Sequence, residues 1–212
     1  MPALKGVNES ARRVVCASNI RQIGFGVALY ADDNRGFVPS SVFISTHGRS
    51  SMPEEMMTLR LGRNMGAGDA GQWDGLGLLY SQQYLAAAKL FYCPSHRGRH
   101  PYSEYASEFD APGAELVSNY HYRGAPPNMP VLFDIEPDST ALVADGMRTI
   151  ADFSHVTGAN VLQANLSVRW VPDDAGRVAS ILARDEDETE GEKVNDAWEW
   201  IDDAVGSSDR PR

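Results

Sequence analysis

The apolar residues near the N-terminus recur at the spacing of an α-helix. Residues 3–34 contain no proline, and the run from Asp32 to Gly36 has the polar residues and the glycine that end helices. At helical periodicity, one apolar stripe lies on a narrow face: Cys16, Ile20, Ile23, Val27 and Tyr30. The pattern predicts one long helix whose second half packs against the rest of the chain.

A second apolar stripe comes earlier on the same helix and faces another way. It consists of Leu4, Val7, Ala11 and Val15, and it is turned from the first stripe by about 100° or more. A helix with two successive apolar faces requires two partners, so the first half is a candidate assembly surface if it projects. Periodicity alone leaves open the alternative that both halves lie in one groove of a single core.

The rest of the chain is rich in loops at first and in strands later. Residues 37–74 and 96–130 have the composition of loops, with one strand candidate at 119–123. We expect helices over 76–89 and 194–205, and strands over 90–94, 139–144, 159–164 and 167–171. This order predicts an α+β fold, with a long N-terminal helix packed on a small antiparallel sheet, loop-rich insertions and a short C-terminal helix.

Composition is that of one globular domain. The chain has 212 residues, of which 42% are hydrophobic and 23% are charged, so it has enough apolar material for a core. We expect residues 1–36 to form the long helix, with its first half projecting, and residues 37–212 to form the head of the same domain. No apolar run is long enough to span a membrane.

The charge distribution excludes one class of function. With 19 basic and 29 acidic residues the net charge is -10, which argues against a nucleic-acid partner because such proteins need a basic surface. The acids concentrate near the C-terminus, where residues 185–192 are mostly Asp and Glu. We expect this acidic segment to be solvated and mobile.

Two groups of residues invite a chemical interpretation. Cys93, His96 and His100 are three metal-ligand types at short spacing, but a closed zinc site needs a fourth ligand and none lies nearby in the sequence. Asp152, Ser154 and His155 contain the residue types of a hydrolase triad, yet a triad is defined by geometry that spacing does not show. We therefore expect no catalytic residue, no resident metal and no cofactor.

Calcium is the alternative that the acidic residues leave open. Carboxylate oxygens suit this ion, and two acidic groups are candidates, although neither has the spacing of an EF-hand. The groups are Asp32 with Asp33, and Asp134 with Glu136 and Asp138.

Several stretches taken together resemble the bacterial type IV pilin-like proteins. The first block is similar to the segment that follows the membrane anchor in that family, and three later blocks are similar to its cysteine box and C-terminal motifs. The first includes Pro2-Ala3-Leu4, Ala11-Arg12-Arg13, Cys16, Ser18 to Gly24, Tyr30 to Asp33 and Gly36. The later blocks are Phe91 to Ser95, Leu142 to Gly146, and His155 with Gly158 to Leu162 and Val168 to Val171. The branch resembled has a prepilin-type cleavage and methylation segment and a processing-associated H-x9-D-G motif.

The chain departs from that motif at one place. Nine residues after His155 the family has Asp-Gly, whereas this chain has Asn165 followed by Leu166. Asn165 keeps an acceptor but has no charge, and a leucine adopts a positive φ less easily than glycine does. The chain therefore lacks the anion and the glycine that the family has at these two positions, while Asp145, Gly146 and His155 match the family.

The resemblance implies a structural subunit rather than an enzyme. We expect the soluble domain of a pseudopilin or minor pilin, in a type II secretion or type IV pilus-like system of the cell envelope. Its partners would be other pilin-like subunits, contacted through the N-terminal helix, and the membrane, reached through an anchor that precedes Pro2. The domain would lie on the non-cytoplasmic side. The alternative is a surface binding module that uses loops 37–74 and 96–130 to hold a polymer or a protein; a hydrolase is a third hypothesis.

Export would place the two cysteines in an oxidising compartment. Cys16 lies on the core-facing stripe of the helix, and Cys93 lies at the end of an expected strand. We therefore expect a disulfide between Cys16 and Cys93, which would contribute about 2–4 kcal/mol to stability.

Overall fold

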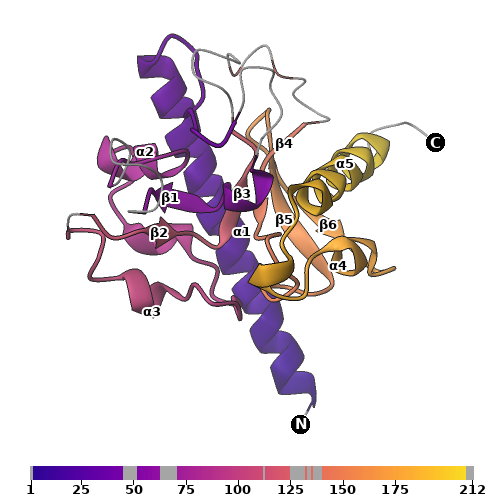
Figure 1. The fold of residues 1–212 in the computed structure, drawn as a ribbon. Coiled ribbons are helices and arrows are strands. Elements are labelled where there is room, and N and C mark those ends of the chain that lie inside the picture. Colours follow the sequence, from indigo (N-terminus) through magenta and orange to yellow (C-terminus); the bar gives the residue numbers. More distant parts are fainter. Residues whose placement is uncertain are drawn as a thin grey trace.

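The computed structural model describes residues 2–44, 52–62, 71–111, 113–124, 132, 135 and 140–208, without the side chains of 2–7 and 207–208. Its architecture is mixed helix and sheet, and the N-terminal helix α1 (Pro2–Asp33) dominates it. This confirms the long helix expected over 3–34. In Figure 1, α1 runs obliquely across the molecule and its N-terminal end extends beyond the rest of the fold.

The main sheet has four antiparallel strands in the order β3-β4-β5-β6. They are β3 (Tyr120–Tyr122), β4 (Ala141–Asp145), β5 (Gly158–Gln163) and β6 (Val168–Pro172). All four agree with expected strands, and the expected hairpin is the β5–β6 pair, in which Ala159 lies opposite Val171. A second, two-stranded sheet pairs β1 (Thr58–Arg60) with β2 (Leu116–Val117).

Helices cover both faces of the main sheet (Figure 1). Helix α1 packs on one face against β5 and β6, and α5 (Gly191–Ser208) packs on the other with α4 (Arg177–Ile181). The expected core stripe of α1 is confirmed, because Cys16, Ile20, Ile23 and Val27 are fully buried. On the opposite face, Trp198 and Ile201 of α5 are buried in a separate core cluster.

The part of the chain that follows α1 and precedes β3 differs from the prediction. The helix expected over 76–89 ends early: α2 (Gly77–Ser81) is followed by Gln83, whose φ of 65° reverses the chain. The strand expected over 90–94 is instead the 3₁₀-helix η2 (Ala88–Phe91). The remaining short elements are η1 (Pro53–Glu55), α3 (Tyr102–Tyr105) and η4 (Glu186–Glu188).

Helix α1 ends where the sequence predicts. Arg35 and Gly36 both adopt positive φ, and the Gly36 N–H donates to the carbonyl of Ala31 over 2.7 Å. This bond satisfies one of the carbonyls that a helix end leaves free. The stretch Asn8–Asp33 is long and apolar enough to cross a membrane by length and composition, but 44% of its window is buried in the head. Core helices and signal sequences pass the same test.

Candidate metal centre

Four residues that are distant in sequence meet beneath α1. Cys16 comes from the middle of α1, and Cys93 follows η2 by two residues. Asp145 is the last residue of β4, and His155 lies in the loop that leads to β5. All four are buried, and one donor atom of each lies within 4.8 Å of the donor atoms of the other three.

The contacts inside this cluster are polar and directed. The Cys16 thiol donates to Asp145 Oδ1 over 2.8 Å. Cys93 Sγ lies 3.5 Å from His155 Nε2, which in turn is 3.8 Å from Asp145 Oδ2. The cluster therefore directs two sulfurs, one imidazole nitrogen and one carboxylate to a common centre.

A second layer of hydrogen bonds orients these four side chains. His155 Nδ1 lies 2.6 Å from Glu9 Oε1, and Ser95 Oγ donates to the same carboxylate over 2.9 Å. Asp145 Oδ2 accepts the backbone N–H of Asn160 over 2.6 Å. Each donor side chain is thus fixed from outside the cluster.

Burial and mutual contact shift the pKa values of the cluster. The hydrogen bond from Cys16 lowers the pKa of Cys93 to about 5, and the contact with His155 acts in the same direction. Burial lowers the pKa of His155, but its bond to Cys93 and the Asp145 carboxylate outweigh this and raise it to about 9. Burial raises the pKa of Asp145 to about 7 and that of Cys16 well above its usual value. The shifts of Cys93 and His155 thus act in opposite directions, and each side chain favours the charged form of the other.

The predicted disulfide is not formed in the structure. Cys16 and Cys93 lie in the same cluster, but both are free thiols. Each sulfur has a polar partner of its own, Asp145 for Cys16 and His155 for Cys93. The sequence analysis placed Cys16 on the core-facing stripe of α1 and Cys93 at the end of a strand, and it did not anticipate these partners.

The other predicted ligand and triad sets do not converge. His96 faces Asp152 at 3.8 Å, and His100 bonds Tyr105 and Glu186, so neither joins Cys93 at a common centre. Asp152 accepts the backbone N–H and hydroxyl of Thr149 through Oδ2. Among the described residues no hydrogen bond joins Ser154 to His155, so the triad geometry is not assembled.

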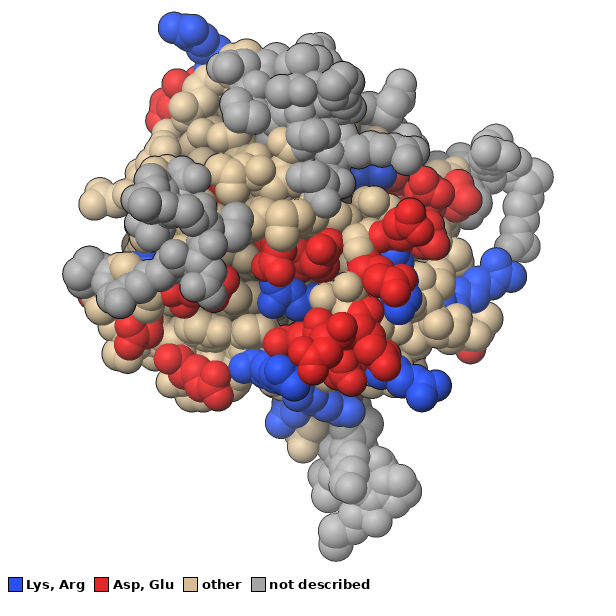
Figure 2. Space-filling model, viewed as in Figure 1, with Lys and Arg blue, Asp and Glu red and all other residues tan. Residues whose placement is uncertain are grey.

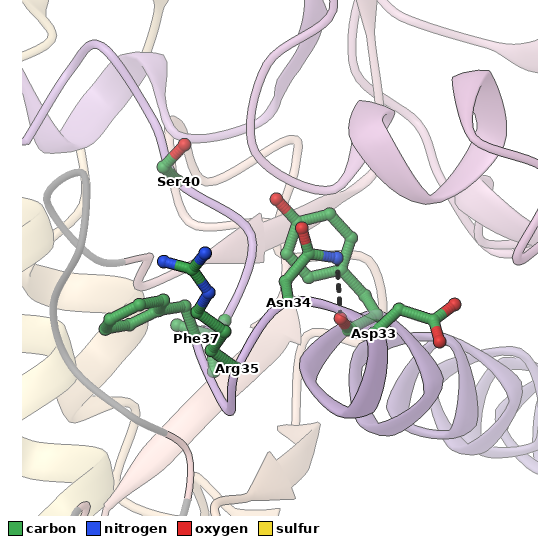
Figure 3. Close-up of a pocket in the computed structure, with 7 residues that line it drawn as sticks. Asp33, Asn34, Arg35, Phe37 and Ser40 are labelled. Atoms are coloured by element: carbon green, nitrogen blue, oxygen red, sulfur yellow. Dashed lines mark hydrogen bonds between the residues drawn. The ribbon is translucent and has the colours of Figure 1, made fainter.

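The candidate calcium residues at the end of α1 form no cage of oxygens. Figure 3 shows the hollow there, in which the carboxylate of Asp33 and the guanidinium of Arg35 extend to opposite sides. Asp33 Oδ2 accepts the hydroxyl of Tyr84 over 3.0 Å, and Asp32 is exposed. The second group, Asp134 with Glu136 and Asp138, lies outside the described residues.

The structure separates the residues of the altered family motif. Asp145 and His155 belong to the cluster, whereas Asn165 and Leu166 form the turn between β5 and β6. Leu166 adopts a φ of 66°, so the turn that favours glycine forms with leucine in its place. Asn165 Oδ1 accepts the backbone N–H of Ser167 over 2.9 Å, which stabilises the turn locally.

Glu9 is the member of the site that sequence reasoning missed. It is the one acid between Lys5 and Arg21, and it lies two turns before Cys16 on the same face of the helix. That placement is a signal that the acid faces the head. Asp145 and His155 were named only as motif residues, because nothing in the sequence shows that they meet Cys16.

An apolar hollow of about 500 Å³ adjoins the cluster and reaches Cys93. Val15, Leu90, Tyr92 and Tyr102 contribute to its wall. Through this hollow a small species can approach the buried sulfur from solvent.

The remaining candidate surface is the early stripe on α1. Ala11 is exposed and Val15 is 50% exposed, while the side chains of Leu4 and Val7 lie outside the described residues.

Comparison with protein-family models, with curated proteins and with solved structures finds no match for this chain.

Proposed function

We propose that this chain is a non-enzymatic structural subunit, the soluble domain of a pseudopilin or minor pilin in a type II secretion or type IV pilus-like system. One observation carries the proposal: α1 has an apolar face toward the head and a second apolar face toward solvent. A helix with that pattern is suited to hold its own domain on one side and a neighbouring subunit on the other.

The outer face of the described helix carries two groups of exposed apolar residues, with the exposed polar residues Ser18 and Gln22 between them. Val14 is 68% exposed, Phe25 59% and Leu29 56%, and together with Ala11 and Val15 they lie opposite the buried stripe. At helical spacing these residues fall within a sector of about 100°. Exposed apolar residues thus recur on the second half, at Phe25 and Leu29, beyond the stripe expected for the first half. An extended apolar surface of this kind is typical of an interaction site.

The head holds α1 further toward its N-terminus than we expected. Glu9 bonds Ser95 and His155, and the Arg13 guanidinium lies 4.2 Å from the centre of the Trp170 ring. Among the residues whose side chains are described, contacts with the head therefore begin at Glu9, and the Arg13 side chain lies against Trp170. Because the head fixes the helix on one side, the outer face is presented with a defined orientation.

Charges at the base of the head fit a location near a membrane. Figure 2 shows acidic side chains on this face, with basic side chains below them around the point where α1 leaves the head. Among the described residues, Arg97, Arg99 and Arg184 line one hollow together with Asp185 and Glu186. We propose an anchor N-terminal to α1, with the basic side chains near anionic headgroups, each contributing about 1 kcal/mol.

Photo-crosslinking in cells tests the proposal. Three variants each carry one photoreactive amino acid. The positions are Val14 on the outer face of α1, Val42 in the loop that follows α1, and Asp174 on the exposed turn between β6 and α4. We expect Val14 to give crosslinks to further copies or to other pilin-like subunits in the envelope fraction, and Asp174 to give none.

The same experiment distinguishes the alternative functions. Crosslinks from Val42 to a different protein, with none from Val14, would support the binding module and contradict the structural subunit. Monomer alone at all three positions would also contradict the proposal. Because all three side chains are exposed, none of the substitutions disturbs the core.

A further inference from the structure

We propose that Cys16, Cys93, Asp145 and His155 form a structural zinc site that fastens α1 to the head. The donor set supports this ion, because zinc binds thiolate, imidazole and carboxylate in four-coordinate sites. All four ligands come from the chain and all are buried, which is the arrangement of a closed site that leaves no position for a substrate. The inference does not depend on the proposed function.

The spacing of the donors suits a tetrahedron. Zinc bonds of ordinary length place neighbouring ligand atoms about 3.3–3.8 Å apart. His155 Nε2 lies 3.5 Å from Cys93 Sγ and 3.8 Å from Asp145 Oδ2. Since every donor atom lies within 4.8 Å of the others, the site closes with side-chain shifts on the order of 1 Å.

The residues around the four ligands support metal binding. Metal-binding histidines commonly donate their second ring nitrogen to a carboxylate, and Glu9 occupies that position at 2.6 Å from His155 Nδ1. The backbone N–H of Ser95 donates to Cys93 Sγ over 3.4 Å, and the backbone N–H of Asn160 donates to Asp145 Oδ2 over 2.6 Å. These contacts aim Nε2, the sulfur and the carboxylate at one point.

Zinc supplies a divalent cation to this buried set of two sulfurs, an imidazole and a carboxylate. Thiolates and a carboxylate without a cation are costly to bury together. On binding, zinc forms bonds to both sulfurs, to Nε2 and to an Asp145 oxygen. The proton on Cys16 and the proton on Nε2 pass to solvent water, and Nδ1 keeps its proton toward Glu9.

Zinc accounts for all four side chains, whereas a disulfide accounts for two. Joining Cys16 to Cys93 would remove the thiol that donates to Asp145 Oδ1 and the sulfur that faces His155. A buried imidazole and a buried carboxylate would then remain without those partners, which is unfavourable. The hydrogen bonds from Glu9 and Asn160 would then orient His155 and Asp145 although neither binds a metal.

The test measures the zinc content of two preparations of the full chain. The first is purified without chelators. The second is reduced, stripped of metal and reloaded with zinc under anaerobic conditions. We expect about one zinc per chain by elemental analysis, with both thiols protected from alkylation until a chelator is added. Cobalt loading is expected to give the intense visible bands of tetrahedral Co²⁺ with thiolate charge transfer. Asp145→Asn and His155→Gln are expected to lower bound zinc at least tenfold.

His96→Gln is the matched control, because His96 is close in sequence to Cys93 but lies outside the donor set, and it should keep full zinc. Glu9→Gln retains all four ligands and lies partly at the surface, so it tests the site without threatening the fold. We expect it to weaken zinc affinity about 10–100-fold. A reduced wild-type chain that takes up no zinc, or zinc content equal in the His155 and His96 variants, would overturn the proposal.

Discussion

One residue with a strained backbone lies in the loop that delivers His155. Val156 has a φ of 62° although it is β-branched, and it is 53% exposed. Its backbone N–H donates to the carbonyl of Phe153, so the turn is closed by the main chain rather than by the valine side chain. The turn holds His155 toward Cys93, and valine is an unfavourable residue in that conformation.

Val156→Asn is expected to stabilise the protein. Asparagine adopts the left-handed conformation more readily, and the exposed valine loses little burial, so the free energy of unfolding should rise by about 1 kcal/mol. The midpoint of thermal unfolding should rise by about 2–4 °C. Ile150→Asn is the control, since Ile150 is 45% exposed and its φ is not positive. Equal changes in both variants would contradict the strain argument.

His121 makes stability depend on pH. It is fully buried, its Nε2–H donates to the carbonyl of Pro53, and Nδ1 accepts the N–H of Met147. Burial lowers its pKa to about 3. Between that value and the ordinary histidine pKa of about 6.5 the unfolded chain binds a proton that the folded chain does not. The neutral histidine therefore stabilises fully above the ordinary value, and this contribution is lost as the pH falls.

We expect the loss to reach about 1.4 kcal/mol per pH unit between pH 6 and 4 for this residue. Other buried groups titrate in the same range, so the measurement is a difference between two chains. Urea unfolding of the wild type and of His121→Gln at pH 4, 5 and 6 should show a shallower pH dependence in the variant. Parallel curves would exclude His121 as the source.

At the scale of elements, close backbone contacts place the loop-rich segment against β1. A Cβ added to Gly77, at the start of α2, would lie 1.9 Å from the carbonyl oxygen of Leu59 in β1. Only glycine allows α2 to approach this strand. The contact fixes where α2 begins, and the positive φ of Gln83 follows its end, so α2 is shorter than the apolar pattern predicted.

Gly77→Ala is expected to destabilise the protein by about 3 kcal/mol or more, because the backbone of α2 or β1 has to move. Gly176→Ala separates this steric effect from a conformational one. Gly176 has a φ of 63°, but no atom lies within 4 Å of an added Cβ. Gly176→Ala should therefore lower the free energy of unfolding by only about 1 kcal/mol. Chemical denaturation of the two variants measures the difference, and equal losses would show that the contact with Leu59 is unimportant.

At the scale of the whole molecule, the order of layers decides which residues meet. The main sheet lies between α1 on one face and α4 with α5 on the other (Figure 1). Arg123 at the end of β3 bonds Asp202 of α5, which links the second helical layer to the sheet. The expected mobility of residues 185–192 stays a prediction; within them Asp185 caps η4, and Glu186 bonds Arg99 and His100.

The sequence by itself determined the elements with long, regular patterns. Helix α1, its buried stripe from Cys16 to Tyr30, the β5–β6 hairpin and the C-terminal helix α5 follow from local periodicity, which depends only on neighbouring residues. It did not determine β1, β2 or the end of α2, because strands of two or three residues carry too little pattern and a close contact with Leu59 positions α2.

Only the tertiary structure decided the site. Cys16 and Asp145 are separated by 129 residues and nevertheless share a hydrogen bond. Their meeting depends on how α1 crosses the sheet and where β4 ends, and neither is a local property of the chain. The sequence supplied two cysteines, a motif aspartate and a motif histidine as separate signals. The packing of the helix against the sheet combines them into one buried set of four ligands.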